Sequence, residues 1–421
     1  MGRQFNRGLE RVFAVHISLL RELDIDLSHC YIRTELRRVL EGVASTVLIA
    51  IKCNEKGEYM TGKIRVAVLF GGRSAEHEVS VISARSMLAA MDRERYEPVM
   101  VGIAKDGRWW ITDGGAPLEE SDQVLGDGAL PVHLDYLGSR KLVAGDIKRW
   151  GVDVVFPLLH GPYGEDGAMQ GLLELADVPY VGAGVVGSAV GMDKEMMKRA
   201  FSAEGLPQLD YTVVRCSHWR RDSEGVLDEL CARFSWPVFV KPASLGSSVG
   251  VSRAEDRRQL RDSIAEAARY DYKVVIEEAA IDCREVEVAI LGNEEVEASI
   301  VGEIEVGSAF YDYGAKYVDN NSSLHIPARI EPNLAEEVRQ MGIRAFRAVE
   351  ACGLSRVDFF VGKSDGQTYI NEINTMPGFT PVSMYPKLWE ASGLAYGALI
   401  DRLIELALER HEDQKGIKTS L

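Results

Sequence analysis

From about residue 60 onward, apolar positions alternate between short continuous runs and stretches with a helical period. The runs at residues 64–70, 96–104 and 152–157 predict strands, whereas residues 79–91 and 169–175 predict helices. Strands that alternate with helices are typical of an open α/β domain with a mainly parallel sheet. We therefore expect ligands beyond the carboxyl ends of these strands, where such sheets bind them.

The later part of the chain has a different order of elements. A helix is predicted from Met192-Asp193-Lys194 to residue 203, and a strand at 237–242 contains Lys241 near its end. Further strands are predicted at 273–278 and from residue 284, with helices at 332–351 and 396–410. This order predicts an α+β region behind the open α/β domain.

Residues 1–59 differ from the rest of the chain. They carry nine basic and eight acidic residues and no recognisable motif. Because domains commonly begin at a strong strand such as 64–70, we interpret residues 1–59 as an N-terminal extension with no assigned role. A functional arm is the alternative. The predicted domains are then residues 60–183, 184–282 and 283–421.

An acidic hairpin is predicted near the end of the chain. Two short apolar strands flank a three-residue loop centred on Asp365, which places Asp358 opposite Glu372 at about 5 Å between the Cβ atoms. Asn374 points to the same face, because side chains alternate along a strand. Two carboxylates and an amide oxygen suit Mg²⁺. The alternative is a solvated acidic face, but the neighbouring residues are apolar and two close carboxylates repel without a cation.

Three glycine-rich loops are further candidate sites. Residues 71–80 contain Glu76 and Glu78, residues 159–167 contain His160, and residues 243–251 follow Lys241. None has the G-x-G-x-x-G spacing of a dinucleotide site, so a nicotinamide cofactor is poorly supported. The loop at 243–251 could bind phosphate through backbone N–H groups or be a flexible hairpin. Either glutamate could simply stabilise a helix N-terminus.

Composition narrows the class of protein. The 421 residues are 46% hydrophobic and 27% charged, as in soluble globular proteins with two or three domains. The net charge of −16 argues against a nucleic-acid partner. The six cysteines are scattered, which favours reduced thiols in the cytoplasm. No apolar run reaches the ~20 residues of a membrane span, and no signal-peptide pattern is present.

Several motifs together resemble the D-alanine–D-alanine ligase family. They are GGRSAEHEVS, HGPYGEDG, MDK, KPASLGSSVGVS, YDYGAKY, RVDFF and NEINTMPG. The resemblance covers about residues 63–410 and implies a two-lobed ATP-grasp fold after the N-terminal domain, with a lid at 308–324. It implies ATP-dependent joining of two D-alanine molecules for peptidoglycan synthesis, by a homodimer in the cytoplasm without membrane or nucleic-acid partners.

The resemblance also implies roles for individual residues. The implied ATP-binding residues are Lys194, Lys241, Ser247, Ser248, Val249, Glu285, Lys316 and one of Glu277 and Glu278. Glu78, Ser247 and Tyr317 would form a hydrogen-bonded trio at the ammonium of the first D-alanine, and Arg356 would stabilise the oxyanion. The implied substrate-binding residues are His160, Gly378, Ser383 and Met384. Asp358, Glu372 and Asn374 would hold two Mg²⁺ ions, with Mn²⁺ as a substitute.

Other hypotheses remain open. The chain could be a different ATP-grasp carboxylate–amine ligase, a D-alanine–D-lactate ligase, or a nucleotide-binding module without catalysis. The HEVS and AKY sequences together disfavour the first, and the YDYGAKY loop with Tyr317 favours the dipeptide over the ester. The complete set of Asp358, Glu372, Asn374 and Arg356 disfavours the last.

Overall fold

The computed structural model describes residues 52–53, 59–60, 62–111, 130–134, 141–144, 148–306 and 322–418. The chain divides into two compact units, Met1–Gly62 and Lys63–Leu421. In the first unit the described residues form one antiparallel strand pair, β1 (Lys52–Cys53) with β2 (Tyr59–Met60). The remaining residues of the predicted extension 1–59 lie outside the described residues.

The second unit begins with an open α/β sheet of strand order β10-β3-β4-β5-β6. Strands β10, β3 and β4 are parallel, and β5 and β6 add an antiparallel edge, which confirms the predicted mainly parallel sheet. Strands β7, β8 and β9 form a small separate sheet. The elements of this region are β3 (Ile64–Gly71), α3 (His77–Ala90), β4 (Tyr96–Ile103), β5 (Trp109–Ile111), β6 (Leu130–Pro131), β7 (His133–Leu134), β8 (Lys141–Ala144), β9 (Lys148–Gly151), β10 (Val154–Pro157), α4 (Ala168–Leu175) and α5 (Val185–Met192).

Alternation along β3 supplies apolar side chains to both faces of this sheet. Val66 and Val68 lie in the same core as Met87 of α3, and Ala67 lies in another core with Leu173 of α4. Because both faces are covered, the strand is apolar at nearly every position, as expected for a parallel sheet. The carboxyl end of β3 then leads into the loop before α3, where the sequence predicted a site.

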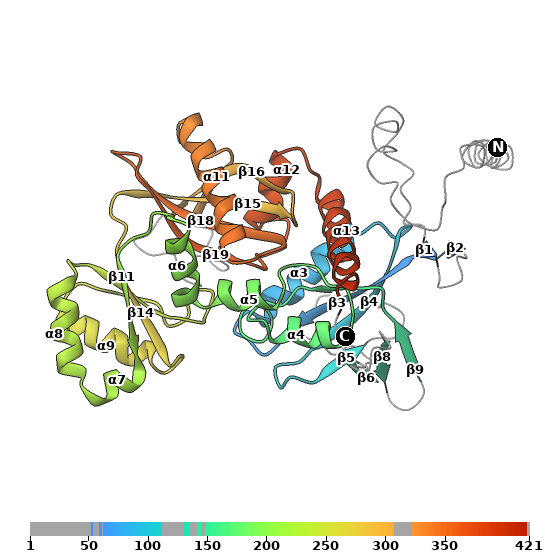
Figure 1. Cartoon of the computed structure of the whole chain (residues 1–421), viewed down its shortest axis with the longest axis horizontal. Coiled ribbons are helices and arrows are strands. Elements are labelled where there is room, and N and C mark those ends of the chain that lie inside the picture. Colours follow the sequence, from blue (N-terminus) through green and yellow to red (C-terminus); the bar gives the residue numbers. More distant parts are fainter. Residues whose placement is uncertain are drawn as a thin grey trace. The chain divides into compact units, whose positions relative to one another are not determined.

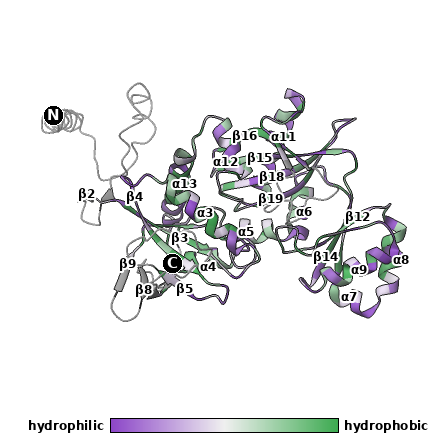
Figure 2. Cartoon of the chain, turned by 180° about the vertical axis from the view of Figure 1, so that it is seen from behind, coloured by the Kyte–Doolittle hydropathy of each residue, from purple (hydrophilic) through white to green (hydrophobic). Residues whose placement is uncertain are grey.

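The central region contains a four-stranded antiparallel sheet of order β11-β14-β12-β13 (Figure 1). Its core takes residues from Val214 to Ile276 and is separate from the other apolar cores of the described chain. Helices α8 and α9 show mixed hydrophilic and hydrophobic positions in Figure 2, as expected for helices with one buried face. The elements are α6 (Lys194–Ala203), β11 (Tyr211–Arg215), α7 (Cys216–Arg221), α8 (Ser223–Arg233), β12 (Val238–Pro242), β13 (Ser252–Ala254), α9 (Arg257–Ala267) and β14 (Lys273–Glu278).

The C-terminal lobe has a five-stranded antiparallel sheet of order β17-β16-β15-β18-β19. One face shares a core with the N-terminal sheet, through residues such as Phe156 of β10 and Phe379. The other face packs against α11 and α6. The elements are β15 (Cys283–Gly292), β16 (Val296–Val306), β17 (Ser322–His325), α11 (Pro332–Ala348), β18 (Gly353–Gly362), β19 (Thr368–Asn374), α12 (Met384–Ala391) and α13 (Tyr396–Lys415).

Helix α6 crosses the predicted division between the lobes. The expected central lobe spans residues 184–282, yet Met197, Phe201 and Leu206 pack into the core of the C-terminal lobe. The apolar core of the central lobe itself begins only at Val214. Helix α6 is therefore attached to the C-terminal lobe by apolar contacts.

The sequence predicted reduced cysteine thiols and no membrane-spanning segment. Cys216, Cys231, Cys283 and Cys352 are free thiols, while the other two cysteines lie outside the residues for which side chains are described. Within the described part of the chain, no helix combines the length and the apolar composition needed to cross a membrane.

We predict that a chain beginning at Met60 folds as the full-length chain does, because the second compact unit begins at Lys63. Its melting temperature should stay within about 2 °C of the full-length value, as measured by circular dichroism. Insoluble protein, or a clearly lower melting temperature, would show that residues 1–59 are part of the folded core.

Candidate active site

The predicted acidic hairpin is formed by β18 and β19. Asp358 lies directly opposite Glu372, and Arg356 lies opposite Asn374. Side chains of these four residues share one face, since they stand two positions apart on paired strands. The predicted pairing of the two carboxylates is confirmed.

The loop of this hairpin differs from the prediction. Val361 pairs with Thr368, one residue away from the partner that a loop centred on Asp365 would give it. An irregularity next to Asp358 shifts the register by one residue and leaves Asn371 as the extra residue. The predicted pair is therefore formed through a β-bulge, and the predicted loop geometry was wrong.

Three carboxylates form a row across the C-terminal sheet. Glu287 of β15 lies opposite Asp358, which lies opposite Glu372. Arg356 donates from Nε and Nη2 to the two Asp358 oxygens at 2.7 Å each, and its Nε lies 3.0 Å from Glu287. Glu287 is buried and the other two carboxylates are partly exposed. Like charges this close require cations, and this arginine supplies one of them.

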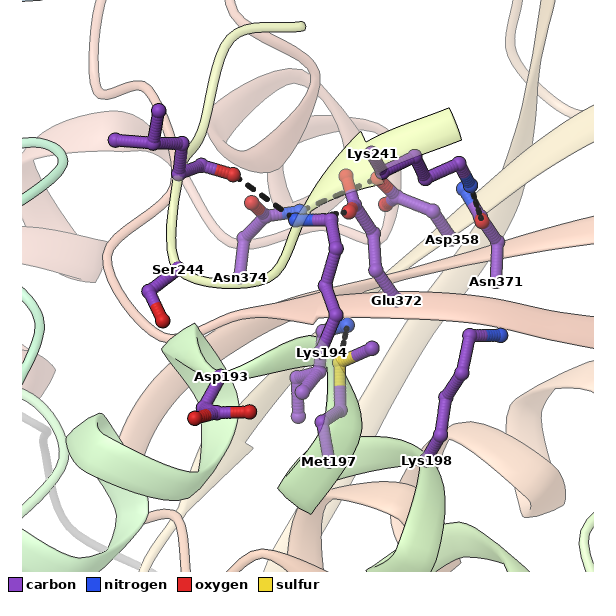
Figure 3. A network of polar contacts seen from close by, with 12 residues as sticks. Asp193, Lys194, Met197, Lys198, Lys241, Ser244, Asp358, Asn371, Glu372 and Asn374 are labelled. Atoms are coloured by element: carbon purple, nitrogen blue, oxygen red, sulfur yellow. Dashed lines mark hydrogen bonds and ion pairs between the residues drawn. The ribbon is translucent and has the colours of Figure 1, made fainter. Parts of the chain in front are cut away.

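Two lysines from other elements face the same hairpin (Figure 3). Lys194 Nζ lies 3.4 Å from Glu372 and donates to the Leu245 carbonyl at 3.0 Å. Lys241 Nζ is 3.5 Å from Asn371 Oδ1. The hairpin, the start of α6 and the end of β12 thus converge on one charged site.

Lys194 owes its position to the start of α6. Asp193 is the N-cap, and its Oδ1 accepts hydrogen bonds from the backbone N–H groups of Glu195 at 3.0 Å and Met196 at 3.2 Å. Such a cap satisfies donors that a helix N-terminus leaves free. The helix therefore begins at Lys194, at the end of the Met192-Asp193-Lys194 segment where the sequence predicted its start.

The loop after β12 contains three residues in the left-handed backbone region. Ser247, Ser248 and Gly250 all have positive φ, at 47°, 58° and 71°. The Val249 N–H donates to the Gly246 carbonyl at 3.1 Å, which closes a tight turn. Left-handed serines cost about 1 kcal/mol or more each and are typical of functional loops whose N–H groups converge.

Glu277 is the acidic residue that shares a sheet face with Lys241. It is 2% exposed, pairs with Lys198, and accepts from Lys241 Nζ at 2.5 Å. Desolvation opposes its ionisation, but Lys198 and Lys241 together lower the pKa of Glu277 to about 2. Glu278 stands opposite Val238 and so lies on the other face. The structure therefore places Glu277, and not Glu278, beside the lysines.

The predicted contact between Glu78 and Ser247 is wrong. Ser247 Oγ donates instead to Glu76 Oε1, whereas Glu78 Oε1 accepts from Lys105 Nζ at 2.5 Å on the surface. Helix α3 begins at His77, so Glu76 stands before its first turn and Glu78 lies within it, directed elsewhere. Glu76 is thus the carboxylate that links the N-terminal domain to the serine loop.

Glycines on both sides leave room for Glu76. A Cβ at Gly161 would lie 2.9 Å from Glu76 Oε2, and a Cβ at Gly246 would lie 3.1 Å from the same atom. Any side chain at either position would displace the carboxylate. The three glycine-rich loops of the sequence therefore meet at Glu76.

His160 is buried next to this carboxylate. Its Nδ1 donates to the Met376 carbonyl at 3.0 Å, and burial lowers the pKa of the ring. Its Nε2 is buried and has no hydrogen-bond partner in the described part of the protein. An anionic group bound at Nε2 would favour the protonated ring, since an adjacent negative charge raises a histidine pKa.

Glu165 is a second carboxylate at the same place. Its Oε1 accepts from the Gly161 N–H at 2.8 Å. Desolvation and the negative charge of Glu76 raise the pKa of Glu165 to about 8. A cationic ligand beside Glu165 would lower this pKa again, because an adjacent positive charge favours the ionised carboxylate.

The residues predicted for a second substrate lie around the start of α12. Ser383 Oγ accepts from the Thr380 N–H at 3.1 Å and lies 2.8 Å from Thr380 Oγ1. A Cβ at Gly378 would lie 3.0 Å from Ser383 Oγ. Met384 is the first residue of α12, so backbone N–H groups of a helix N-terminus stand beside Ser383.

Glu285 lies in β15 opposite Phe360 and Ile304, two residues before Glu287 and so on the same face of the sheet. Desolvation opposes the charge of Lys241, but the negative charges of Glu277, Glu372 and Glu285 together raise the pKa of Lys241. Lys316, Tyr317 and most of the predicted lid lie outside the described residues.

Sequence reasoning missed several residues of the site. Glu165 lies in the HGPYGEDG motif and was available from it, and Glu287 follows Glu285 by the two-residue period of a strand. Lys198 and Thr380 carry no local signal. Their roles depend on the partners Glu277 and Ser383, which only the fold brings near them.

Comparisons with known proteins agree on one family. Residues 65–183 match the family model described as "D-ala D-ala ligase N-terminus", and residues 200–405 match "D-ala D-ala ligase C-terminus". A D-alanine–D-alanine ligase of Acetivibrio thermocellus is 49% identical over 84% of this chain and 98% of its own.

Solved structures give the same result. The D-alanine–D-alanine ligase of Coxiella burnetii aligns with a TM-score of 0.74 at 37% identity, over 84% of this chain and 96% of its own. The VanG D-Ala:D-Ser ligase of Enterococcus faecalis aligns with a TM-score of 0.73 at 32% identity, over 82% of this chain and 100% of its own.

The raised pKa of Glu165 predicts a pH-dependent stability. A glutamate whose folded pKa lies above its ordinary 4.5 loses its contribution to stability as the pH rises from about 4.5 to about 8. In ligand-free protein, Glu165→Gln should therefore melt at a higher temperature than the wild type at pH 8.5, with the difference shrinking towards pH 5. The same substitution at exposed Glu390 is the control. A difference in melting temperature that does not change with pH would refute the raised pKa of Glu165.

Proposed function

The chain belongs to the D-alanine–D-alanine ligase family, and on that premise we propose that it joins two D-alanine molecules into D-alanyl-D-alanine with ATP. The carboxylate of the first D-alanine would take the γ-phosphoryl group of ATP to give an acyl phosphate and ADP. The amine of the second would attack, and phosphate would leave. The product serves peptidoglycan synthesis. The contact of Ser247 with Glu76 carries the proposal, because it joins an amino-acid site to a phosphate loop.

The fold is ATP-grasp, and ATP lies between its lobes in the proposed complex. Lys194, Lys241 and the N–H groups of Ser247, Ser248 and Val249 are proposed to bind its phosphates. Cations and converging N–H groups are the usual partners of phosphate oxygens. Glu285, Glu277 on the adenine side and Lys316 complete the proposed ATP-binding residues, with Glu277 preferred to Glu278 for its place beside Lys241.

Asp358, Glu372 and Asn374 fit a magnesium site. They present two carboxylates and an amide on one face, and the structure already surrounds the carboxylates with Arg356 and Lys194. We propose that they hold two Mg²⁺ ions, with Mn²⁺ as a substitute. When bound, Mg²⁺ would offset the negative charge of the transferring phosphoryl group.

The first D-alanine is proposed to bind beside Glu76 and Glu165. Glu76 takes the role predicted for Glu78 and receives the ammonium, together with Ser247 and Tyr317. The carboxyl group then lies towards His160, whose buried Nε2 would gain a partner. Ion pairing in so enclosed a site is strong because little water competes.

The second D-alanine is proposed to bind near the start of α12. The Ser383 hydroxyl and the Met384 N–H would receive its carboxylate, at a helix N-terminus that favours anions. Arg356 and the Gly378 N–H would stabilise the oxyanion of the tetrahedral intermediate. Arg356 Nε also lies 3.0 Å from Glu287, so the arginine keeps an acidic partner if Asp358 binds a cation.

We further propose a homodimer located in the cytoplasm, as the family resemblance implies. Light scattering coupled to size-exclusion chromatography would measure the mass of the assembly. A monomeric mass at micromolar concentration would refute the dimer without affecting the proposed reaction.

We predict that Asp358→Asn and Glu372→Gln each lower the turnover with ATP and D-alanine about 100-fold or more. Each change removes one negative charge from the metal site and keeps nearly the same shape. ADP release and the mass of the product measure the effect, with D-serine, D-lactate and L-alanine as alternative substrates. Wild-type turnover of either variant at limiting Mg²⁺ contradicts the metal assignment, and no D-alanine-dependent ADP release by the wild type contradicts the function.

We predict that Glu76→Gln raises the KM for D-alanine about 10-fold or more, because a hydrogen bond to a charged group is worth about 1.5–3 kcal/mol. Glu78→Gln is the matched control and should change this KM less than about 2-fold, since Glu78 is paired with Lys105 at the surface. A larger rise in the KM for D-alanine in Glu78→Gln than in Glu76→Gln would instead support the role that the sequence predicted for Glu78.

A further inference from the structure

Lys273 is a buried lysine at the start of β14, and its ammonium group faces protein carboxylates. It is 2% exposed, pairs with Asp193, and its Nζ lies 3.1 Å from Glu195. These two acidic residues flank Lys194 in the sequence, and Asp193 is also the cap that begins α6. Lys273 therefore holds the chain on both sides of the proposed phosphate-binding lysine.

Main-chain hydrogen bonds complete a closed ring through the same residues. The Lys194 N–H donates to the Ala243 carbonyl at 2.8 Å, and the Ala243 N–H donates to the Lys273 carbonyl at 3.1 Å. The ring returns from the Lys273 side chain to Asp193. Helix α6, strand β12 and strand β14 are thus fixed to one another at the point where Lys194 leaves the backbone.

Asp271 extends this ring to the serine loop. Its Oδ2 accepts from the Ser244 N–H at 2.7 Å, and its Oδ1 accepts from the Lys273 N–H at 3.1 Å. Ser244 is where the chain turns from β12 into the loop, and Lys194 Nζ donates to the carbonyl of the next residue, Leu245, at 3.0 Å. The lysine and the loop that are proposed to hold the phosphates therefore have a common support.

Stability alone does not account for such a cluster. A buried ion pair is seldom more stabilising than apolar residues of the same volume, because desolvation offsets the attraction. Glu195 also has Arg199 at 2.7 Å and Arg215 at 3.0 Å, so its charge is balanced without Lys273. The distinctive contact of Lys273 is the one with Asp193, at the start of α6.

We propose that Lys273, supported by Asp271, is a positioning residue that sets Lys194 where it can bind the phosphates of ATP. It acts through Lys194 and does not touch the nucleotide. The inference rests on the proposed function, in which Lys194 and the loop bind ATP. Lys273 and Asp271 belong to the central lobe, and they would support a binding residue without contacting the nucleotide themselves.

The test compares Lys273→Met, Lys273→Arg and Asp271→Asn, with Arg199→Met as the matched control. Arg199 contacts the same Glu195 but is 63% exposed in its side chain and lies outside the ring. Lys273→Met should raise the KM for ATP about 10-fold and leave the KM for D-alanine within about 2-fold. Lys273→Arg should recover most of the loss, and Arg199→Met should resemble the wild type.

A double-mutant cycle with Lys194→Met separates positioning from a merely structural role. If Lys273 acts through Lys194, adding Lys273→Met to Lys194→Met should raise the KM for ATP less than about 2-fold further. Additive effects overturn the proposal, as does a wild-type KM for ATP in a folded Lys273→Met. If Lys273→Met does not fold, Asp271→Asn decides: a wild-type KM for ATP overturns the proposal, and a raised one supports it.

The two proposals fail in different ways. An unchanged KM for ATP in Lys194→Met contradicts the phosphate role of Lys194 and so the proposed function of this site. A defective Lys194→Met beside an unaffected Lys273→Met contradicts the positioning role alone. Isothermal titration with ADP checks each result without depending on turnover.

Discussion

Buried opposite charges between α6 and the central sheet constrain the whole site. Glu277 is 2% exposed and is held between Lys198 of α6 and Lys241 of β12. Removing Glu277 would leave buried Lys198 without its acidic partner, and breaking a buried pair in this way costs about 3–5 kcal/mol. The helix and the two strands must therefore keep their relative positions before any nucleotide arrives. Lys194 occupies the first turn of the same helix and inherits that position.

Opposite charges also balance one another on the hairpin formed by β18 and β19. The row of Glu287, Asp358 and Glu372 is neutralised in part by Arg356 and Lys194. In the proposed magnesium complex, cations would redistribute these pairs, and Asp358 and Glu372 would exchange protein partners for metal. Such a site is organised in advance by its electrostatics, which lowers the reorganisation needed at the moment of reaction.

The sequence predicted the elements of the site better than the contacts between them. The start of α6 at Lys194 was predictable, because a capping aspartate precedes a clear helical period. The choice between Glu76 and Glu78 was not, since it depends on the residue at which α3 begins and on a partner 171 positions away. The register at Asp358 was predicted from a loop geometry that the structure replaces with a bulge. Bulges have no reliable local signature, because their position is set by packing on both sides of a strand.

The separate core of the central lobe has a thermodynamic consequence. Its apolar residues, from Val214 to Ile276, belong to no other cluster of the described chain, and ion pairs such as those of Lys198 and Lys273 join it to α6. Without a continuous apolar core, the lobe can open as its own cooperative unit at a lower free energy than global unfolding. Amide hydrogens of β11 to β14 would then exchange together and ahead of those in the parallel sheet. Nucleotide bound against this lobe would slow that exchange, because a ligand stabilises the form that binds it.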